Sequence, residues 1–339
     1  MRKIILLLSL LALGFYGKSQ ERDSIFLFNG QVLIGDIKNG NLGIIKIDDK
    51  DLKILSIKAY KIKHVTTGPH LFRIETTDKH VIYSPLRKTD KPGQVAVVDG
   101  SSVVILNLTD IALLSPVQKN FFKRLTGNFG LGFSFSKSSG IGQLNSNANV
   151  YYTYRRTQYQ LTANMLASID TSSFSRDNEN IQLFGSFDLK MPWFLAGQLL
   201  YQRNLQLSIS RRFQEMLGAG NKLVLKNNWQ VWAVSGISLG QERSTEGTDA
   251  VTLEMPYMFR INFFEYRKFN MQLGIYQTFF VSLSQWGRVR YDGSINYSHE
   301  LIHNFYVNLN LYSNYDNRPP DPNSGKFDYG ISLSVNYKF

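Results

Sequence analysis

The sequence predicts an all-β protein, in which a small all-β domain precedes an antiparallel transmembrane β-barrel of about 12 strands. Three observations predict this class. Apolar and polar residues alternate strictly over long segments in the second part of the chain. Aromatic residues are concentrated in that part, and the chain ends on an aromatic residue inside its last alternating segment.

The composition excludes several classes of protein. The 339 residues include no Cys and carry a formal net charge of +12, so a disulfide scaffold and a thiolate metal site are both excluded. Hydrophobic residues make up 43% of the chain, which excludes intrinsic disorder. Beyond the extreme N-terminus, no apolar run approaches the roughly 20 residues of a membrane-spanning helix.

Residues 1–19 are expected to be a secretory signal peptide. Arg2 and Lys3 precede an apolar stretch over residues 4–13, and small residues precede the expected cleavage site at Gln20. The alternative is an N-terminal membrane anchor, but the apolar stretch is shorter than the roughly 17–25 residues of a membrane span. The chain is therefore expected to be exported.

Aromatic residues place a domain boundary near residue 118. Of 45 aromatic residues, seven lie before residue 118 and 38 lie after it. Residues 20–117 contain 13 Lys and Arg against 11 Asp and Glu, and residues 118–339 contain 22 against 15. The two regions differ in composition more than in the sign of their charge.

Residues 20–117 have the pattern of a small periplasmic all-β domain. Type I′ hairpin chemistry occurs between short apolar strands at Asn29-Gly30, Asn39-Gly40 and Asp99-Gly100. The order of strands and turns recurs over residues 71–116, so two SH3-like or Lsm-like repeats are one interpretation. An exported domain with nearly balanced charge predicts no nucleic-acid partner, and a domain without its own ligand is the favoured interpretation.

The C-terminal segment has the clearest alternation. Its apolar residues, each followed or preceded by a polar residue or Gly, are Phe327, Tyr329, Ile331, Leu333, Val335, Tyr337 and Phe339. Period two predicts a strand with one apolar face. That face contacts the core in a soluble sandwich and lipid in a membrane barrel, and periodicity alone does not separate these two.

Segment length and the position of aromatic residues favour the barrel. The segments exceed the roughly 5–6 residues of globular strands and match the roughly 9–11 of tilted membrane strands. Aromatic residues stand near one set of turns (Trp193, Trp229, Tyr266, Phe305 and Phe339) and near the other set (Trp286, Tyr291 and Tyr315). Two interfacial girdles have this arrangement.

The last residues also resemble the terminal signal that is read by the outer-membrane barrel assembly machinery. Val335, Tyr337 and Phe339 are the matching positions. This machinery is therefore an expected partner during biogenesis.

The expected strands are 128–137, 143–155, 157–170, 180–190, 193–204, 206–226, 229–242, 250–265, 269–284, 287–302, 304–315 and 326–339. An even number of strands leaves both ends of the barrel on one side of the membrane, which suits a periplasmic N-terminal domain. The alternation loses its phase between Arg211 and Gly220. Ten or fourteen strands therefore remain alternatives.

Residues 118–339 resemble the salt-induced outer-membrane protein family, which is the domain of unknown function number four-eight-one. The matching residues are Tyr201-Gln202-Arg203-Asn204, Arg211-Arg212, Gly218-Ala219-Gly220, Gly236 and Glu242, followed by an alternating barrel end. Ala219 stands where the family's Gly-rich stretch usually has Gly. The resemblance implies an outer-membrane barrel without an assigned reaction, and it brings no catalytic residues.

No catalytic site, cofactor or metal site is expected. A barrel phospholipase of 12 strands uses Ser, His and Asn, but neither His299 nor His303 is followed two residues later by Ser, as that pattern requires. Asp316, Asp321 and Asn323 offer oxygen ligands that Ca²⁺ accepts. Their spacing lacks the EF-hand pattern, and nearby prolines favour a stiff, solvated loop.

Charged residues are expected inside the barrel. If the apolar positions face lipid, the inward positions include Arg155, Asp188, Lys190, Glu254, Arg260, Arg288, Arg290, Asp292 and Glu300. Both signs are present, which fits a compensating network in a narrow barrel or a charged constriction that selects solutes. Inward aromatic residues would fill the volume and favour the network; they are Tyr151, Trp232, Tyr276, Phe280, Tyr306 and Tyr312.

The sequence therefore favours an outer-membrane β-barrel with a periplasmic N-terminal domain. Its role is either that of a narrow passive channel or that of a non-conducting membrane scaffold. Outer-membrane lipid is an expected partner, and a periplasmic protein or the cell wall is left open as another. The alternative is a soluble periplasmic or secreted all-β binding protein.

Overall fold

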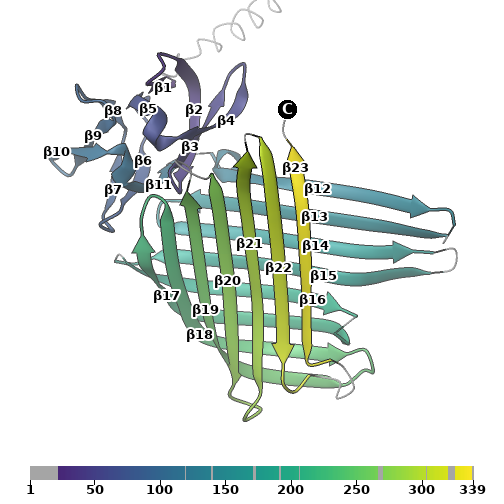
Figure 1. The fold of residues 1–339 in the computed structure, drawn as a ribbon. Coiled ribbons are helices and arrows are strands. Elements are labelled where there is room, and N and C mark those ends of the chain that lie inside the picture. The colour runs from purple at the N-terminus through teal and green to yellow at the C-terminus, as the bar shows by residue number, and fades with distance from the viewer. Residues whose placement is uncertain are drawn as a thin grey trace, which may run out of the picture.

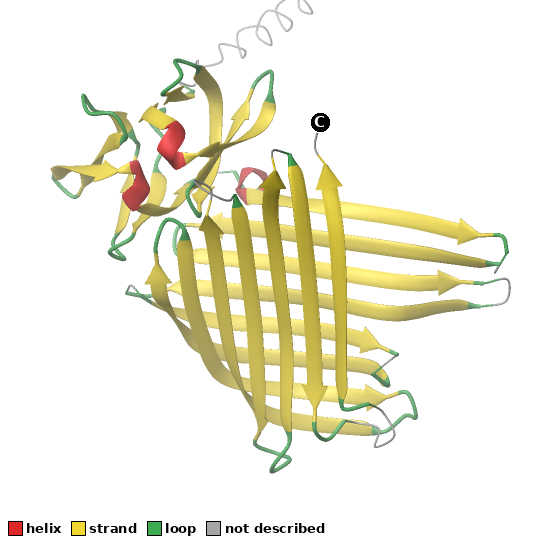
Figure 2. Ribbon diagram, in the orientation of Figure 1, coloured by secondary structure: helices red, strands yellow, loops and turns green. Residues whose placement is uncertain are grey.

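The computed structural model describes residues 22–337 except 119, 139, 171–172, 191, 206, 266–269, 303 and 320–324. The predicted signal peptide, Tyr266, His303 and Phe339 lie outside the described residues. The described chain folds into strands and a few short 3₁₀ turns (Figures 1 and 2). Across these segments we find no helix with the length and apolar character to cross a membrane.

The N-terminal domain consists of two small sheets. Its strands are β1 (Asp23–Leu27), β2 (Val32–Asn41), β3 (Ile44–Asp49), β4 (Lys53–Lys58), β5 (Ile62–Thr66), β6 (Phe72–Thr76), β7 (Val81–Ser84), β8 (Arg87–Lys88), β9 (Gln94–Asp99), β10 (Ser102–Asn107) and β11 (Ile111–Pro116). An 8-stranded sheet has the order β4-β3-β2-β11-β6-β7, with β1 and β5 attached, and a 3-stranded sheet has the order β10-β9-β8.

Two parts of this domain end in the same way. The 3₁₀ turn η2 (Ala59–Lys61) precedes β5, and η3 (Leu108–Asp110) precedes β11. Strand β5 pairs with β1, the first strand of its part, and β11 pairs with β6, the first strand of the second part. Strand β11 also pairs with β2, so the two parts share one sheet.

The prediction of a turn at Asn39-Gly40 is wrong. Both residues lie inside β2 and pair with Lys46 and Ile45 of β3. The turn forms at Leu42 and Gly43, which have φ values of 47° and 71°.

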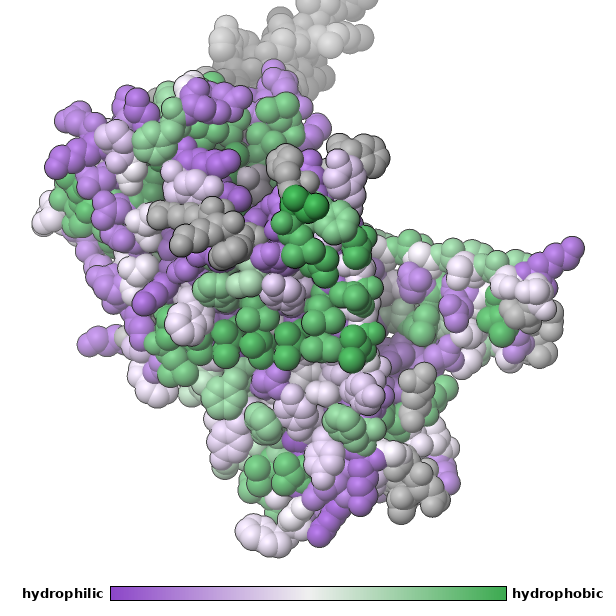
Figure 3. Space-filling model, viewed as in Figure 1, coloured by the Kyte–Doolittle hydropathy of each residue, from purple (hydrophilic) through white to green (hydrophobic). Residues whose placement is uncertain are grey.

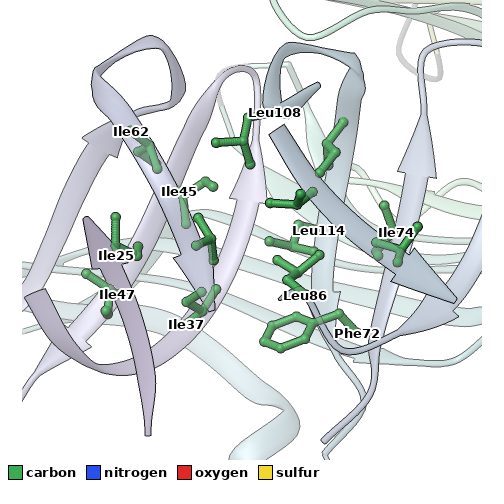
Figure 4. Packing of buried hydrophobic residues seen from close by; sticks show 14 of the residues in the cluster. Ile25, Ile37, Ile45, Ile47, Ile62, Phe72, Ile74, Leu86, Leu108 and Leu114 are labelled. Carbon is green, nitrogen blue, oxygen red and sulfur yellow. The ribbon is translucent and has the colours of Figure 1, made fainter. Parts of the chain in front are cut away.

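The interior of the N-terminal domain is apolar (Figure 4). Ile25, Ile47 and Phe72 are fully buried, and Ile74 and Leu114 join them from β6 and β11. Burying a side chain of this size contributes roughly 1.5–3 kcal/mol. The apolar core therefore holds the two sheets together, and the chain has no Cys for a disulfide.

A third sheet contains 12 antiparallel strands in sequence order, which confirms the expected fold class. We call it the barrel sheet. Its strands are β12 (Leu125–Ser136), β13 (Ile141–Tyr154), β14 (Thr157–Ile169), β15 (Phe174–Asp188), β16 (Trp193–Asn204), β17 (Ile209–Leu225), β18 (Trp229–Ser244), β19 (Asp249–Glu265), β20 (Met271–Ser282), β21 (Val289–Ile302), β22 (Phe305–Asp316) and β23 (Phe327–Tyr337). The turn η4 (Phe122–Arg124) leads into it.

Strand β17 is continuous through the segment where the sequence alternation loses its phase. Its ladders shift register only near its two ends, at Ile209/Arg211 and Lys222/Val224. In between, Arg212 and Met216 are both buried while Glu215 is exposed. The sequence pattern is irregular because charged and apolar residues occur on both faces of this strand. The side chains nevertheless alternate regularly between the two faces.

The two edge strands of the barrel sheet are β12 and β23. Ladders join each strand to the next along the chain, but within the described residues no ladder joins β12 directly to β23. Figure 1 shows the sheet curving strongly between these edges.

The outer face of the barrel sheet is apolar. Phe129, Leu131, Leu217, Ile331 and Leu333 are each more than three-fifths exposed, at 72%, 67%, 77%, 64% and 68%. In Figure 3, hydrophobic residues form a belt across the strands, whereas the N-terminal domain is mostly hydrophilic on its surface. Water does not favour so large an apolar area, so this face fits contact with lipid.

Candidate functional site

The inner face of the barrel sheet buries charged side chains. Glu254 is 0% exposed, Arg288 is 2% exposed and Arg290 is 3% exposed. Gln214 and Ser238 are also buried. A buried charge is stable only when it is paired and hydrogen-bonded, so the partners of these groups decide what the lumen can do.

The first set of paired charges joins β17, β19 and β21. Arg290 donates from Nε to Oε1 of Glu254 at 2.9 Å and from Nη2 to Oε2 at 2.5 Å. Gln214 donates its Nε2 to the same Oε2 at 3.1 Å. This two-point contact is the strong geometry of an arginine and a carboxylate, and it links three strands across the lumen.

A second set lies beside it. Arg288 Nη2 is 2.6 Å from Asp316 Oδ2 and 3.1 Å from Glu242 Oε2. Arg212 donates its Nε to Glu242 Oε1 at 2.9 Å, so Glu242 holds two guanidinium groups. Together the two sets form the far-end cluster, which consists of Arg212, Glu242, Glu254, Arg288, Arg290 and Asp316.

The far-end cluster lies away from the N-terminal domain. Strand β18 begins beside that domain, where Gln230 donates to Asn41 at 2.7 Å, and runs the length of the sheet to Glu242. Arg288 lies in the turn just before β21, and Asp316 is the last residue of β22, at that same distant end. The lumen is therefore crossed by paired charges at the end opposite the N-terminal domain.

A second group of charges joins the N-terminal domain to the barrel sheet. Arg73 contacts both Glu75 and Asp188. Lys222 Nζ lies 2.8 Å from Glu75 Oε2 and 3.3 Å from Asp188 Oδ1. We call these four residues the docking cluster. Two of them come from β6, one from the end of β15 and one from β17, so the cluster fixes the domain to the sheet.

The docking cluster is largely buried, and its positive charges shift the pKa of Glu75. Burial alone would raise the pKa of Glu75, but the positive charges of Lys222 and Arg73 outweigh it and hold the pKa below its ordinary value of 4.5. The carboxylate is therefore ionised at neutral pH and stabilises the docked arrangement. Additional contacts across this interface join Gln230 to the Ala112 carbonyl at 3.4 Å and Lys79 to the Leu223 carbonyl at 3.2 Å.

Arg155 and Lys190, which were expected on the inner face, lie beyond the ends of their strands. Strand β13 ends at Tyr154 and β15 ends at Asp188. Arg155 lies in the next turn with a φ of 50°, and Lys190 lies in a bend, and both side chains are exposed. The expectation extended the alternation beyond the last residue of each strand, where side-chain parity no longer holds.

The remaining expected lumen residues do not form a single network. Asp292 lines a cavity of about 30 Å³ together with Arg212 and Arg290. Glu300 accepts hydrogen bonds from the Asn270 side chain and, at 2.8 Å, from the Asn304 backbone. These two carboxylates lie at opposite ends of β21, so the charges divide between the two ends of the barrel sheet.

The middle of the lumen is hollow. One cavity of about 210 Å³ lies under Asn41 and Leu113 of the N-terminal domain. A second cavity of about 590 Å³ continues from it, and Gln160, Trp232 and Arg260 line both. The wall of the second cavity consists mainly of amide, hydroxyl and aromatic groups, so a polar solute fits it better than an apolar one.

Several functional residues were missed by the sequence reasoning. Arg212 was hidden by the irregular pattern of β17, and Asp316 was considered only as a loop oxygen ligand. Nothing local in the sequence marks Arg73 or Glu75, because their partners in the barrel sheet lie more than one hundred residues away. The same parity that identified Glu254, Arg288 and Arg290 would have found Arg212, because Arg212 shares the parity of Gln214 on β17.

The residues of the expected assembly signal are only partly described. Val335 and Tyr337 lie in β23 with exposures of 55% and 63%, on the apolar face together with Leu333. Phe339, Asp321 and Asn323 lie outside the described residues. No group of three or more possible metal-ligating side chains occurs in the described part of the chain.

Solved structures that resemble this chain include porins. The NanC porin is 8% identical over 63% of this chain and 98% of its own, with a TM-score of 0.35. Another porin is 10% identical over 94% of this chain and 98% of its own, with a TM-score of 0.30. OccK11 (OpdR) of Pseudomonas aeruginosa is 10% identical over 79% of this chain and 83% of its own, with a TM-score of 0.29.

Among sequences, no curated protein matches this chain. A family does match: the family described as "Protein of unknown function, DUF481" covers residues 132–339, which are more than half of the chain and nearly the whole barrel sheet. This protein therefore belongs to the DUF481 family.

Proposed function

We propose that this protein is an outer-membrane β-barrel that serves as a non-conducting scaffold while its N-terminal domain is docked. The observation that carries the proposal is the arrangement of buried charges at the two ends of the lumen. The far-end cluster ties β17, β18, β19, β21 and β22 together across one end. The docking cluster holds a folded domain against the other end. A solute that crosses the lumen would have to pass both clusters.

The apolar outer face supports a membrane location and outer-membrane lipid as the solvent of that face. Trp193 and Trp229 begin strands at the docked end and Trp286 lies at the other end, which suits two interfacial girdles. The N-terminal domain would then lie in the periplasm, where a periplasmic protein or the cell wall is accessible. The barrel assembly machinery remains the proposed partner during insertion. No enzymatic role is proposed.

Single-channel recording of the purified full chain in planar bilayers tests the proposal. We expect no steady conductance from the wild-type protein. Lys222→Gln combined with Arg290→Gln, which removes one cation from each cluster, should produce openings. Lys226→Gln is the matched control, because Lys226 is exposed just beyond β17. Steady conductance of the wild-type protein with its N-terminal domain docked would refute the scaffold.

A narrow passive channel is the second candidate, and the central cavities favour it because they are polar and about 210 and 590 Å³ in volume. The same recordings decide between the two, since a channel conducts without any substitution. The soluble alternative has a separate test. Recovery of the processed protein in the soluble periplasmic fraction without detergent would exclude both membrane roles.

A further inference from the structure

Arg260 differs from the other inward-facing arginines of the barrel sheet. Its guanidinium lies 5.0 Å from the ring centre of Trp232 and 4.6 Å from that of Tyr276. Its Nη1 lies 3.5 Å from Oε1 of Gln160, and its Nε is buried without a hydrogen-bond partner. No salt bridge among the described residues includes this side chain.

The lumen offers a direct comparison. Arg212, Arg288 and Arg290 each contact a carboxylate within 3.1 Å. Glu254, which faces inward from the same strand as Arg260, is held by Arg290. A cation in a polar cavity without a carboxylate can pair with an anion from solution. The attraction between the two charges replaces the stabilisation by water that the cation loses inside the cavity. The two aromatic rings supply only part of that stabilisation.

The cavities around Arg260 have space for such an anion. Among the described residues that line the cavity of about 590 Å³, Arg260 is the only charged one. The adjoining cavity of about 210 Å³ adds one other charge, Lys222, which is already paired with Glu75 and Asp188. The local charge is therefore positive and uncompensated, while Asn164 and Thr162 offer amide and hydroxyl groups for neutral parts of a ligand.

We propose that Arg260 binds the oxyanion of a small polar solute inside the lumen, beneath the N-terminal domain. The ligand class is a carboxylate or phosphate that also carries hydroxyl groups. The planar guanidinium suits two-point binding of an oxyanion. The amides and hydroxyls of the wall suit the hydroxyl groups. Trp232 and Tyr276 hold the guanidinium in place.

This site goes beyond the proposed scaffold and does not depend on conduction. A barrel that never opens still binds a solute that reaches the cavity, and an open channel without this site conducts without binding. Binding measured in detergent therefore fails or succeeds separately from the bilayer recordings. Calorimetric binding and bilayer conductance are therefore independent of each other.

Calorimetric titration of the purified full chain in detergent tests the site. The probes are inorganic phosphate, glucuronate, and glucose as the neutral counterpart of glucuronate. We expect saturable binding of at least one anion and a much weaker response to glucose. Arg260→Gln should weaken anion binding roughly 10- to 100-fold, the loss expected for a hydrogen bond to a charged group. Preference for phosphate or glucuronate identifies which oxyanion the site takes.

Two further variants complete the design. Arg260→Lys keeps the charge but loses the planar fork, so it should bind with intermediate affinity. Arg243→Gln removes an exposed arginine of the outer face and should bind like wild type. If Arg260→Gln does not fold, Gln160→Ala should still weaken binding, since Gln160 lines both cavities.

Tryptophan fluorescence provides an independent readout, because Trp232 contacts Arg260. Anion binding should change the emission of wild type and not that of Trp232→Phe. The proposal is overturned by the absence of saturable binding of either anion. It is also overturned by equal binding of glucose and glucuronate, or by wild-type affinity in Arg260→Gln.

Discussion

The N-terminal domain and the barrel sheet use the same alternation with opposite polarity. In the N-terminal domain, the buried set is Ile25, Ile47 and Phe72 and the exposed set is mostly polar. In the barrel sheet, the buried set includes Glu254 and Arg290, while large apolar side chains are exposed. Period two therefore fixes which residues share a face, and the solvent decides which face turns outward.

The comparison also indicates how the two regions differ in what holds them together. An apolar core tolerates changes in shape, because its contacts have little directionality. A buried polar interior depends on each group having a partner at the right distance. We therefore expect a single substitution inside the lumen to reduce the free energy of unfolding more than a substitution of similar volume change in the apolar core.

The largest effect is expected for Arg290→Ala. It leaves the buried carboxylate of Glu254 with only Gln214 as a partner, and a buried charge that loses its counter-ion typically costs ~3–5 kcal/mol. Unfolding in detergent, followed by heat-modifiable migration on gels and by circular dichroism, measures the loss.

The double variant Arg290→Ala with Glu254→Ala separates pairing from packing. If the two charges compensate each other, the double change costs less than the sum of the single changes. Strict additivity with small single effects would mean that the far-end cluster is hydrated, and the lumen would then resemble a wet pore rather than a closed interior.

The next effect in size concerns the outer face. Leu309 pairs with Leu333 and Tyr297, and Asn310 pairs with Asn296 and Ser332 on the inner face. Leu309→Arg should destabilise the barrel sheet by ~2–4 kcal/mol if it lies near the middle of the bilayer. Asn310→Arg should be tolerated or change only the lumen. Equal loss of stability in lipid vesicles at both positions would contradict the assigned faces.

A smaller effect is expected at the docking cluster, and it depends on pH. Because the pKa of Glu75 is lower when the domain is docked than its ordinary value of 4.5, its carboxylate stabilises docking at neutral pH. That contribution persists above about pH 4.5 and is lost as the pH falls through the lowered pKa.

Limited proteolysis of the linker around residue 118 from pH 7 to pH 3 measures this release. Glu75→Gln should weaken docking at pH 7, by about 1–3 kcal/mol as for a buried group that loses a charged partner, and should flatten the pH dependence. Thr77→Ala, two residues away at the end of β6, is the control. A wild-type pH profile in Glu75→Gln would show that Glu75 does not govern docking.

The strands of this protein are predictable from sequence because their signal is local. Alternation predicts strands from local residues alone, so the 12 strands of the barrel sheet were expected and found. Strand β15 begins at Phe174 instead of near residue 180, because polar residues such as Asp177 and Glu179 look like a loop when their inward orientation is unknown.

The candidate sites were less predictable because they depend on distant partners. Parity indicates that Glu254 and Arg260 face inward, and it does not indicate that Arg290 takes the carboxylate and leaves Arg260 without one. The docking of Arg73 on Asp188 joins residues that no local pattern connects. Pairing across a curved sheet requires the curvature, which alternation does not encode.

The smallest loss of stability is expected at Arg243, and its neighbour Glu242 allows a direct comparison of the two faces of β18. Glu242 faces inward and contacts Arg212 and Arg288, whereas Arg243 faces outward and lies 3.5 Å from Asp249 with 48% of its side chain exposed. Arg243→Gln should change unfolding stability by roughly 0–1 kcal/mol, since exposed ion pairs contribute little. Glu242→Gln should cost several times more, because it leaves two buried guanidinium groups short of a carboxylate. Measured side by side in detergent, similar losses at both positions would mean that burial is not what separates the two faces of β18, and the contrast between the apolar core and the charged lumen would no longer hold.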